Sequence, residues 1–411
     1  MAKIQTHIFQ NGLPALYIPA PSASVYTAVF TYGAGTRFET QEKEGISRFY
    51  TNICLQGNQE YPDKNALAEA IDKLGLSFRT TVSPEYTMSY FSSAEELFVP
   101  SLKLVLKLYL KPSLTEEALE AEKKLNLAEV EFTQRNPQFK SLNQLLLRVF
   151  PNSSLGFNLL GTQESLNNID LNSLQEFKNK YFVSQNCLLT ILGPKKNFSF
   201  ASLNNVASFL PEGPRQEFAP VDFNQIQTVQ EKESQPGQAS YLSYASLCFG
   251  RNSNQRVNQS LLINILSEGR NNKRLNILQK NLLTSSVKPW IKIFSDTGLF
   301  LIQAVAPATK EEELKTALQE ELTRLITTNP INQEELNQAK AYYQNSLLQR
   351  LDNSLEKAMF YSLGVFFNLE DQSPEQIIKK MKQITLEDIN QTAQAIFKPD
   401  FLSFVIVGPG F

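Results

Sequence analysis

Phe182-Val-Ser-Gln-Asn-Cys-Leu-Leu-Thr-Ile-Leu-Gly-Pro194 recurs in altered form as Phe397-Lys-Pro-Asp-Phe-Leu-Ser-Phe-Val-Ile-Val-Gly-Pro409, at an offset of 215 residues (409 − 194 = 215). The same offset maps Ile169 and Leu171 onto Ile384 and Leu386, where each copy opens an amphipathic helix. Each copy therefore predicts a helix, a short turn and an apolar strand that ends at Gly-Pro. A repeat at this spacing indicates two similar units in one chain.

The remaining segments of the two copies also follow the same order. Residues 25–32 and 240–247 both alternate like strands with one buried face, and 83–92 corresponds to 290–304. The helices after Pro100 correspond to those of 310–352. We therefore predict an α+β fold of two homologous domains, each a mainly antiparallel sheet with helices packed on one face, related by a pseudo-twofold axis.

Leucines alternate strictly from Leu102 to Leu110, which taken alone suggests a strand. We predict a helix instead, because Leu and Lys are strong helix formers, with Pro100 in its first turn and Pro112 as its stop. Residues 211–234 are rich in Gln, Glu and Pro and lack apolar periodicity, as a linker does. The predicted domains are therefore 1–210 and 235–411.

Composition excludes several classes of partner. The 411 residues are 42% apolar, and 39 basic against 41 acidic residues leave a net charge of −2. Nucleic acid is not an expected partner, because duplex binding is driven by basic surface. The sequence contains no run of 18 apolar residues, so we do not expect a membrane-spanning helix. The N-terminal residues do not resemble a signal or transit peptide.

The cysteines and the single histidine do not suggest a metal site of their own. Cys54, Cys187 and Cys248 are scattered, so we expect small buried apolar side chains and no disulfide framework or structural zinc site. His7 precedes Asn11-Gly12, in the first strand segment, and one imidazole cannot build a two-histidine site. We expect it to be a packed or surface side chain.

Several short motifs, in their order and spacing, resemble the pitrilysin/insulinase metallopeptidase superfamily, with its LuxS/MPP-like domains. They are Asn11-Gly-Leu13, Gly33-Ala-Gly-Thr-Arg-Phe38, Gly45-Ile-Ser47, Asn65-Ala-Leu-Ala-Glu-Ala-Ile-Asp-Lys-Leu-Gly75 and Ser295-Asp-Thr-Gly-Leu-Phe-Leu-Ile302. The similarity is to the branch of mitochondrial processing peptidase and of the core subunits of the cytochrome bc1 complex (complex III), and it covers essentially the whole chain.

The resemblance implies a zinc motif in 44–57 that this chain has lost. Active members carry His-x-x-Glu-His on a helix, with two zinc ligands one turn apart and a general base. Arg48 and Asn52 stand at the histidine positions and Thr51 at that of the base. Glu129 lies at the position of the third ligand (129 − 52 = 77), and Glu122 at a further acidic position of the family. Arg cannot shed its proton to bind a cation, and Thr is no base near neutral pH.

Two interpretations of Glu129 follow. It is either a charged residue on a solvated helix face, or the partner of Arg48 in an ion pair that replaces zinc. In the second repeat, the resemblance places degenerate substrate-binding positions at Lys273, or the adjacent Arg274, and at Ser286, where active members have Arg and Tyr. The glycine-rich substrate loop of the non-catalytic processing subunit is also missing, because 267–273 contains one glycine.

The resemblance implies a non-catalytic structural core subunit of complex III, most like its second core subunit, on the matrix side of the mitochondrial inner membrane. Its expected partners are a chain like core subunit 1 and the membrane, haem and iron–sulfur subunits, with no cofactor in this chain. The alternative is a non-catalytic substrate-binding or regulatory subunit of a heterodimeric zinc processing peptidase, mitochondrial or bacterial, in the latter case in the cytoplasm or periplasm. Motifs of an unrelated active site, such as Gly-x-Ser-x-Gly or a phosphate loop, do not occur.

Overall fold

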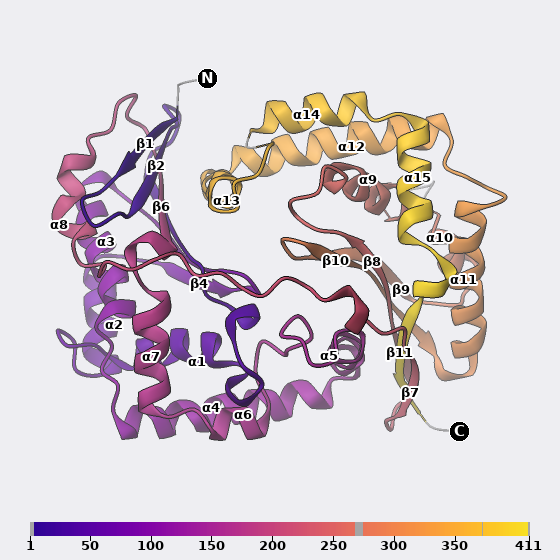
Figure 1. Ribbon diagram of the computed structural model, residues 1–411, viewed down its shortest axis with the longest axis horizontal. Helices are drawn as coiled ribbons and strands as arrows, with labels where there is room; N and C mark the ends of the chain where they lie inside the picture. The colour runs from indigo at the N-terminus through magenta and orange to yellow at the C-terminus, as the bar shows by residue number, and fades with distance from the viewer. Residues whose placement is uncertain (1–3, 268–273, 372, 410–411) are drawn as a thin grey trace. The chain divides into compact units, whose positions relative to one another are not determined.

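The computed structural model describes residues 4–267, 274–371 and 373–409, which divide into two compact units. The first consists of the described parts of Met1–Glu131, Phe157–Ala219 and Arg350–Asn368. The second consists of those of Phe132–Gly156, Pro220–Gln349 and Leu369–Phe411. Figure 1 labels the helices and strands along the chain.

The first unit is built on a six-stranded sheet in the order β1-β2-β6-β3-β5-β4. Its pairings are antiparallel except for the parallel pair β2–β6. The strands are β1 Gln5–Ile8, β2 Pro14–Pro19, β3 Tyr26–Tyr32, β4 Phe78–Val82, β5 Thr87–Ser93 and β6 Cys187–Gly193.

Helices cover both faces of this sheet. Tyr17, Phe30 and Phe91 belong to a core with most of the helices, whereas Val29 and Leu192, on the opposite face, pack with Ala358 and Tyr361 of α13. The helices of the unit are α1 Ile46–Ile53, α2 Lys64–Lys73, α3 Glu95–Leu110, α4 Glu116–Arg135 as far as Glu131, α6 Gln163–Asn167, α7 Leu171–Tyr181, α8 Asn204–Ala207 and α13 Ser354–Phe366.

The second unit repeats this plan with a five-stranded sheet in the order β7-β11-β8-β10-β9, in which only β11–β7 is parallel among the described pairs. The strands are β7 Gln230–Ser234, β8 Ala239–Phe249, β9 Ser286–Ile293, β10 Thr297–Pro307 and β11 Ser403–Gly408. The helices are α5 Pro137–Val149, α9 Arg256–Ser267, α10 Asn276–Lys280, α11 Glu311–Ile326, α12 Gln333–Asp352, α14 Pro374–Gln383 and α15 Leu386–Ile396.

Each sheet takes one helix from the other half of the chain. α13 packs on β3 and β6 of the first unit, and α5 packs on β8 and β11 of the second, where Leu145 and Val149 meet Val405. The predicted limits 1–210 and 235–411 therefore describe the order of elements along the chain and not the compact units. The last residues of the predicted linker, Gln230–Ser234, form β7, because β11 provides partners for their backbone groups.

The predicted offset of 215 residues is confirmed at both ends of one helix pair. α7 runs from Leu171 to Tyr181 and α15 from Leu386 to Ile396, and each begins with a reciprocal capping box. The predicted helix over 102–110 is also confirmed, but it begins at Glu95, so Pro100 lies inside α3 and not in its first turn. No helix of the described ranges has the length and apolar character needed to cross a membrane.

Candidate functional site

The helix that carries Arg48, Thr51 and Asn52 begins at a sharply fixed point. Gly45, with a φ of 90°, precedes α1, and a Cβ there would lie 2.8 Å from the Gly161 backbone. The Glu39 carboxylate accepts the backbone N–H of Gly45 at 2.7 Å and of Ser47 at 2.9 Å. It thus satisfies donors that the first turn of a helix leaves free, and it places a negative charge at the positive end of the helix dipole.

Two buried carboxyl groups surround this helix start. Burial raises the pKa of Glu39 to about 7, although the N–H groups of Gly45 and Ser47 oppose the shift. Burial also raises the pKa of Glu44, whose carboxylate accepts the Asn158 N–H at 2.6 Å. The start of α1 is therefore held by acidic groups that titrate above their ordinary range.

Arg48 and Glu129 form the ion pair predicted as one of two interpretations of Glu129. Nη2 of Arg48 on α1 lies 2.7 Å and 2.9 Å from the two carboxylate oxygens of Glu129 on α4. The side chains are 31% and 42% exposed, so solvent screens the attraction and its net contribution is on the order of 1 kcal/mol or less. The pair joins the two positions, 48 and 129, that the resemblance assigns to zinc ligands.

Two further polar groups near the pair, the Glu122 carboxylate and the Thr51 hydroxyl, are also hydrogen-bonded within the protein. Glu122 is buried and accepts bonds from Gln56 Nε2 at 3.0 Å and Asn126 Nδ2 at 2.6 Å. The Thr51 hydroxyl donates to the Arg48 carbonyl at 2.8 Å, and Asn52 lies one turn after Arg48, partly buried. Sequence reasoning missed Gln56 and Asn126. Gln56 follows Asn52 by four residues and Asn126 follows Glu122 by four, so each lies on the same helix face as a position that the sequence had already indicated.

These residues do not fit a zinc ion. Arg48 is a cation in contact with Glu129, the carboxylate that the resemblance suggested as a ligand, and the Thr51 hydroxyl donates to the backbone of its own helix. In the part of the chain that the structure describes, no three His, Cys, Asp or Glu side chains gather as metal ligands do. The Arg48–Glu129 pair is a polar bridge between α1 and α4.

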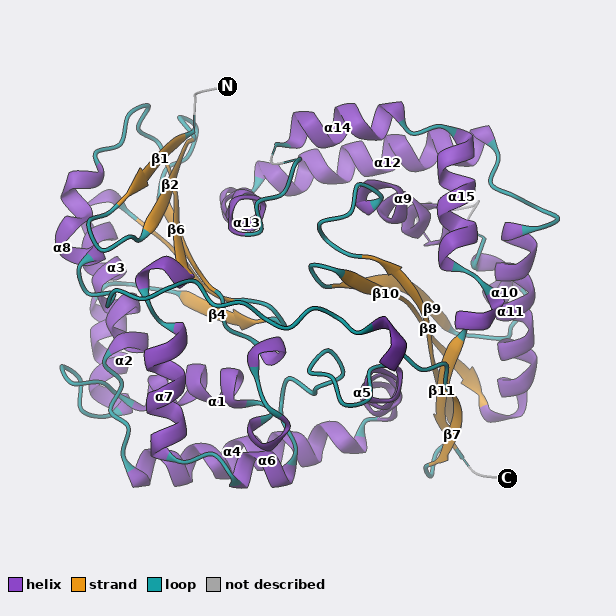
Figure 2. Ribbon diagram, viewed as in Figure 1, coloured by secondary structure: helices purple, strands orange, loops and turns teal. Residues whose placement is uncertain are grey.

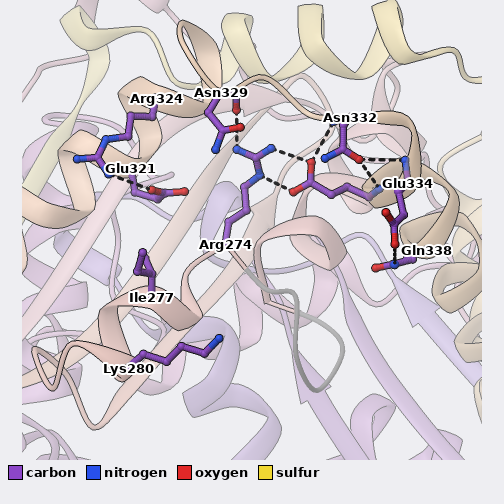
Figure 3. A pocket seen from close by; sticks show the side chains of 10 residues that line it. Arg274, Ile277, Lys280, Glu321, Arg324, Asn329, Asn332, Glu334 and Gln338 are labelled. Carbon is purple, nitrogen blue, oxygen red and sulfur yellow. Dashed lines mark hydrogen bonds and ion pairs between the residues drawn. The ribbon is translucent and has the colours of Figure 1, made fainter.

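Of the second-repeat positions, Arg274 lines a hollow and Ser286 does not. Arg274 is 9% exposed and donates to Glu335 through Nε and Nη2, both at 2.7 Å, and to the carbonyls of Asn329 and Pro330. It lines a hollow of about 450 Å³ together with charged side chains such as Glu321 and Arg324 (Figure 3). Ser286 is exposed at the start of β9 and is not among the lining residues, and Lys273 falls outside the described residues. The substrate-binding role of these positions stays a prediction.

The histidine and the cysteines lie where the sequence suggested. His7 on β1 stacks on Phe200, with ring centroids 4.9 Å apart, and meets the edge of Phe9. Cys54 and Cys187 are buried free thiols, and Cys248 is a partly buried one. Burial raises the pKa of all three thiols, so they are packing groups and not nucleophiles.

Family models match the two repeats in turn. The model described as "Insulinase (Peptidase family M16)" matches residues 16–163, and that described as "Peptidase M16 inactive domain" matches residues 168–343. The chain belongs to peptidase family M16. Membership explains the two-repeat plan of this M16 chain, and the resemblance drawn from its short motifs is confirmed.

Relatives with curated names come from bacteria and from mitochondria. "Uncharacterized zinc protease YmxG" of Bacillus subtilis is 22% identical, over 99% of this chain and 98% of its own length. "Non-peptidase homolog YmxG" of Helicobacter pylori is also 22% identical, over 99% and 94%. A cytochrome b-c1 complex reductase subunit of Candida albicans is 23% identical, over 93% and 85%.

Solved structures share the fold at low identity. A structure titled as a peptidase M16 inactive domain from Pseudomonas fluorescens has a TM-score of 0.91 at 20% identity, covering 100% of this chain and 98% of that one. A chain of complex III2 from Candida albicans has a TM-score of 0.80 at 20% identity, covering 98% and 95%. These likenesses establish the M16 architecture in two α+β repeats.

Proposed function

We propose that this chain is a non-catalytic M16 subunit that acts by binding other chains. The observation that carries the proposal is the Arg48–Glu129 ion pair, because the resemblance assigns these two positions to zinc ligands of active members. With Thr51 at the position of the general base, the chain cannot activate water in the manner of its active relatives. The name "non-peptidase homolog" of the Helicobacter pylori relative supports the same interpretation.

The chain is proposed to hold no cofactor of its own. Haem and iron–sulfur clusters in proteins are held mainly by His, Cys, Met or Tyr side chains. Here the one histidine is packed between Phe9 and Phe200, and two of the three cysteines are buried as thiols. Any redox or zinc chemistry of an assembly that contains this chain therefore belongs to other subunits.

The first setting that we propose is a heterodimer with a homologous, zinc-bearing M16 chain. Bacterial relatives that match nearly the whole chain support it, as does the absence of the zinc-motif histidines from residues 44–57 of this chain. In that assembly the present chain contributes a surface and a substrate-binding wall, and its partner supplies the zinc and the base. Its location would then be the bacterial cytoplasm or periplasm, or mitochondria.

The second setting is a core subunit of complex III, peripheral to the mitochondrial inner membrane on its matrix side. The Candida albicans relative favours it, because that protein bears the name of a cytochrome b-c1 complex subunit. The partners would be a chain like core subunit 1 and the membrane, haem and iron–sulfur subunits. Neither setting requires metal or catalytic residues in this chain.

Purification of the untagged assembly from its native cells tests both settings. Mild-detergent extraction and native electrophoresis, followed by haem staining, zinc analysis and mass spectrometry, identify what travels with the chain. A zinc-bearing M16 partner without haem supports the first setting, and comigration with b- and c-type haem supports the second. A chain that travels alone and hydrolyses peptides in a zinc-dependent manner refutes the proposed function.

A further inference from the structure

The outer strand of the second sheet carries two lysines and a tryptophan on one face. β9 lies at the end of the order β7-β11-β8-β10-β9. Figure 2 draws the strands of this sheet in orange. Lys288, Trp290 and Lys292 share a face, because successive side chains of a strand alternate. Their partners on β10 are Gln303, Leu301 and Leu299. We call Lys288, Trp290 and Lys292 the β9 strip.

This strip continues the apolar face that α5 covers. Trp290 packs against the cluster that contains Leu145 and Val149 of α5 and Leu301 of β10. α5 itself packs on β8 and β11, two strands that lie on the far side of β10 from β9 in the strand order. Trp290 consequently remains partly exposed beside a lysine on either side.

The two lysines carry positive charge with no counter-charge. Within the described residues, neither Lys288 nor Lys292 forms an ion pair, and Lys288 is exposed. Lys292 is partly buried, with Nζ 5.9 Å from the centre of the Phe294 ring, and burial lowers its pKa to about 8. A partly buried ammonium group without an anion is costly, so the strip favours a ligand that brings one.

We propose that the β9 strip is a docking site for an acidic, extended segment of a partner protein. Lys288 and Lys292 are four residues apart, about 13 Å along a strand. An extended segment has the same period, so carboxylates four residues apart would meet the two lysines, and an apolar side chain between them would cover Trp290. This inference concerns the second unit and does not depend on the loss of zinc from the first.

Side chains, and not the strand edge, would carry this recognition. Pro289 has no N–H and interrupts the outer backbone edge of β9, which disfavours the addition of a further strand. A nucleic acid would also be poorly matched, because the strip offers only two cations on a chain of net charge −2. An acidic peptide matches both the charge and the spacing.

Trp290 provides the readout, because it is the only tryptophan in the sequence. The full chain is titrated with a synthetic peptide that carries two glutamates four residues apart around a central leucine, while the emission of Trp290 is followed. A second peptide with glutamines in place of the glutamates is the ligand control. We expect a saturable change in emission with the acidic peptide, weakened by added salt, and at least about tenfold weaker binding of the glutamine peptide.

Variants that remove the same number of charges distinguish docking at the β9 strip from attraction of the acidic peptide to the overall charge of the chain. Lys288→Ala with Lys292→Ala should weaken binding about tenfold or more, whereas Lys379→Ala with Lys382→Ala, which removes two exposed lysines on α14 of the second unit, should leave it unchanged. Lys288→Glu with Lys292→Glu should reverse the preference, so that a peptide with lysines in place of the glutamates binds instead. Circular dichroism establishes that each variant is folded.

Three results would overturn the proposal. The first is the absence of a saturable emission change with the acidic peptide. The second is equal weakening by the matched control variant, which would mean attraction to overall charge. The third is binding of a single-stranded oligonucleotide as tight as that of the peptide, which would indicate a nucleic-acid surface.

Discussion

Glu39→Gln should abolish a pH dependence that the wild-type chain shows at the start of α1. Burial raises the pKa of Glu39 from 4.5 to about 7. Below pH 4.5 the carboxyl group is protonated in the folded and unfolded states, and its contribution to stability is fully present. As the pH rises through 7, the folded state must hold a buried charge that the unfolded state exposes to water, so that contribution is lost.

The size of the effect follows from the shift. A difference of about 2.5 pKa units (7 − 4.5) corresponds to about 3 kcal/mol, or about 300-fold in an opening equilibrium. The nearby groups that titrate or carry charge are Glu44, whose charge opposes ionisation of Glu39, and Tyr181, whose hydroxyl donates to the Phe38 carbonyl. Neither is altered by the substitution.

Hydrogen exchange with mass spectrometry measures the opening of α1 in the full chain between pH 5 and pH 8, after correction for intrinsic exchange rates. Protection of residues 46–53 should fall in the wild type by about 70-fold more than in Glu39→Gln over this range, because part of the contribution is already lost at pH 5. Glu42→Gln, at an exposed glutamate of the same loop, should keep the wild-type slope. Parallel slopes in wild type and Glu39→Gln, or protection that rises with pH in the wild type alone, would refute the reasoning.

Three further predictions concern the two repeats. A double-mutant cycle of Arg48→Ala and Glu129→Ala, measured by urea unfolding, should give a coupling of about 0.5 kcal/mol, and one above about 3 would contradict the partly exposed geometry. Arg274→Ala should destabilise the second unit by about 3 kcal/mol, seen as a lower unfolding midpoint, because Glu335 loses its partner. The triple variant Arg48→His, Thr51→Glu, Asn52→His should bind zinc in equilibrium dialysis, and adding Glu129→Ala should weaken that binding. Zinc binding that is unchanged by Glu129→Ala would mean that the metal lies elsewhere.

The repeat was predictable from spacing, because an offset of 215 relates α7 to α15. The ion pair was one of two interpretations that the resemblance implied, because it assigns residues 48 and 129 to one site, and the structure confirms the pair. The packing of α5 and α13, each on the sheet formed mainly by the other half of the chain, was not predictable. An apolar helix face such as that of Ala358 and Tyr361 indicates that the helix is buried, but it does not indicate against which sheet.

The network around Glu122 was missed for a different reason. Gln56 and Asn126 are neutral amides, and such side chains on a helix usually face solvent, so their type does not reveal a buried carboxylate partner. Arg274 shows the same limit, since its bonds to Glu335 and to two carbonyls join segments about 60 residues apart. Only the folded chain brings these groups together.

The zinc content of the natively purified chain tests the central claim most directly. The chain is equilibrated with zinc, passed through gel filtration and analysed by mass spectrometry of the metal, with the Arg48→His, Thr51→Glu, Asn52→His variant as positive control. We predict far less than one zinc per wild-type chain, because Arg48 holds Glu129. One zinc per wild-type chain, lost on Glu129→Ala, would contradict the account.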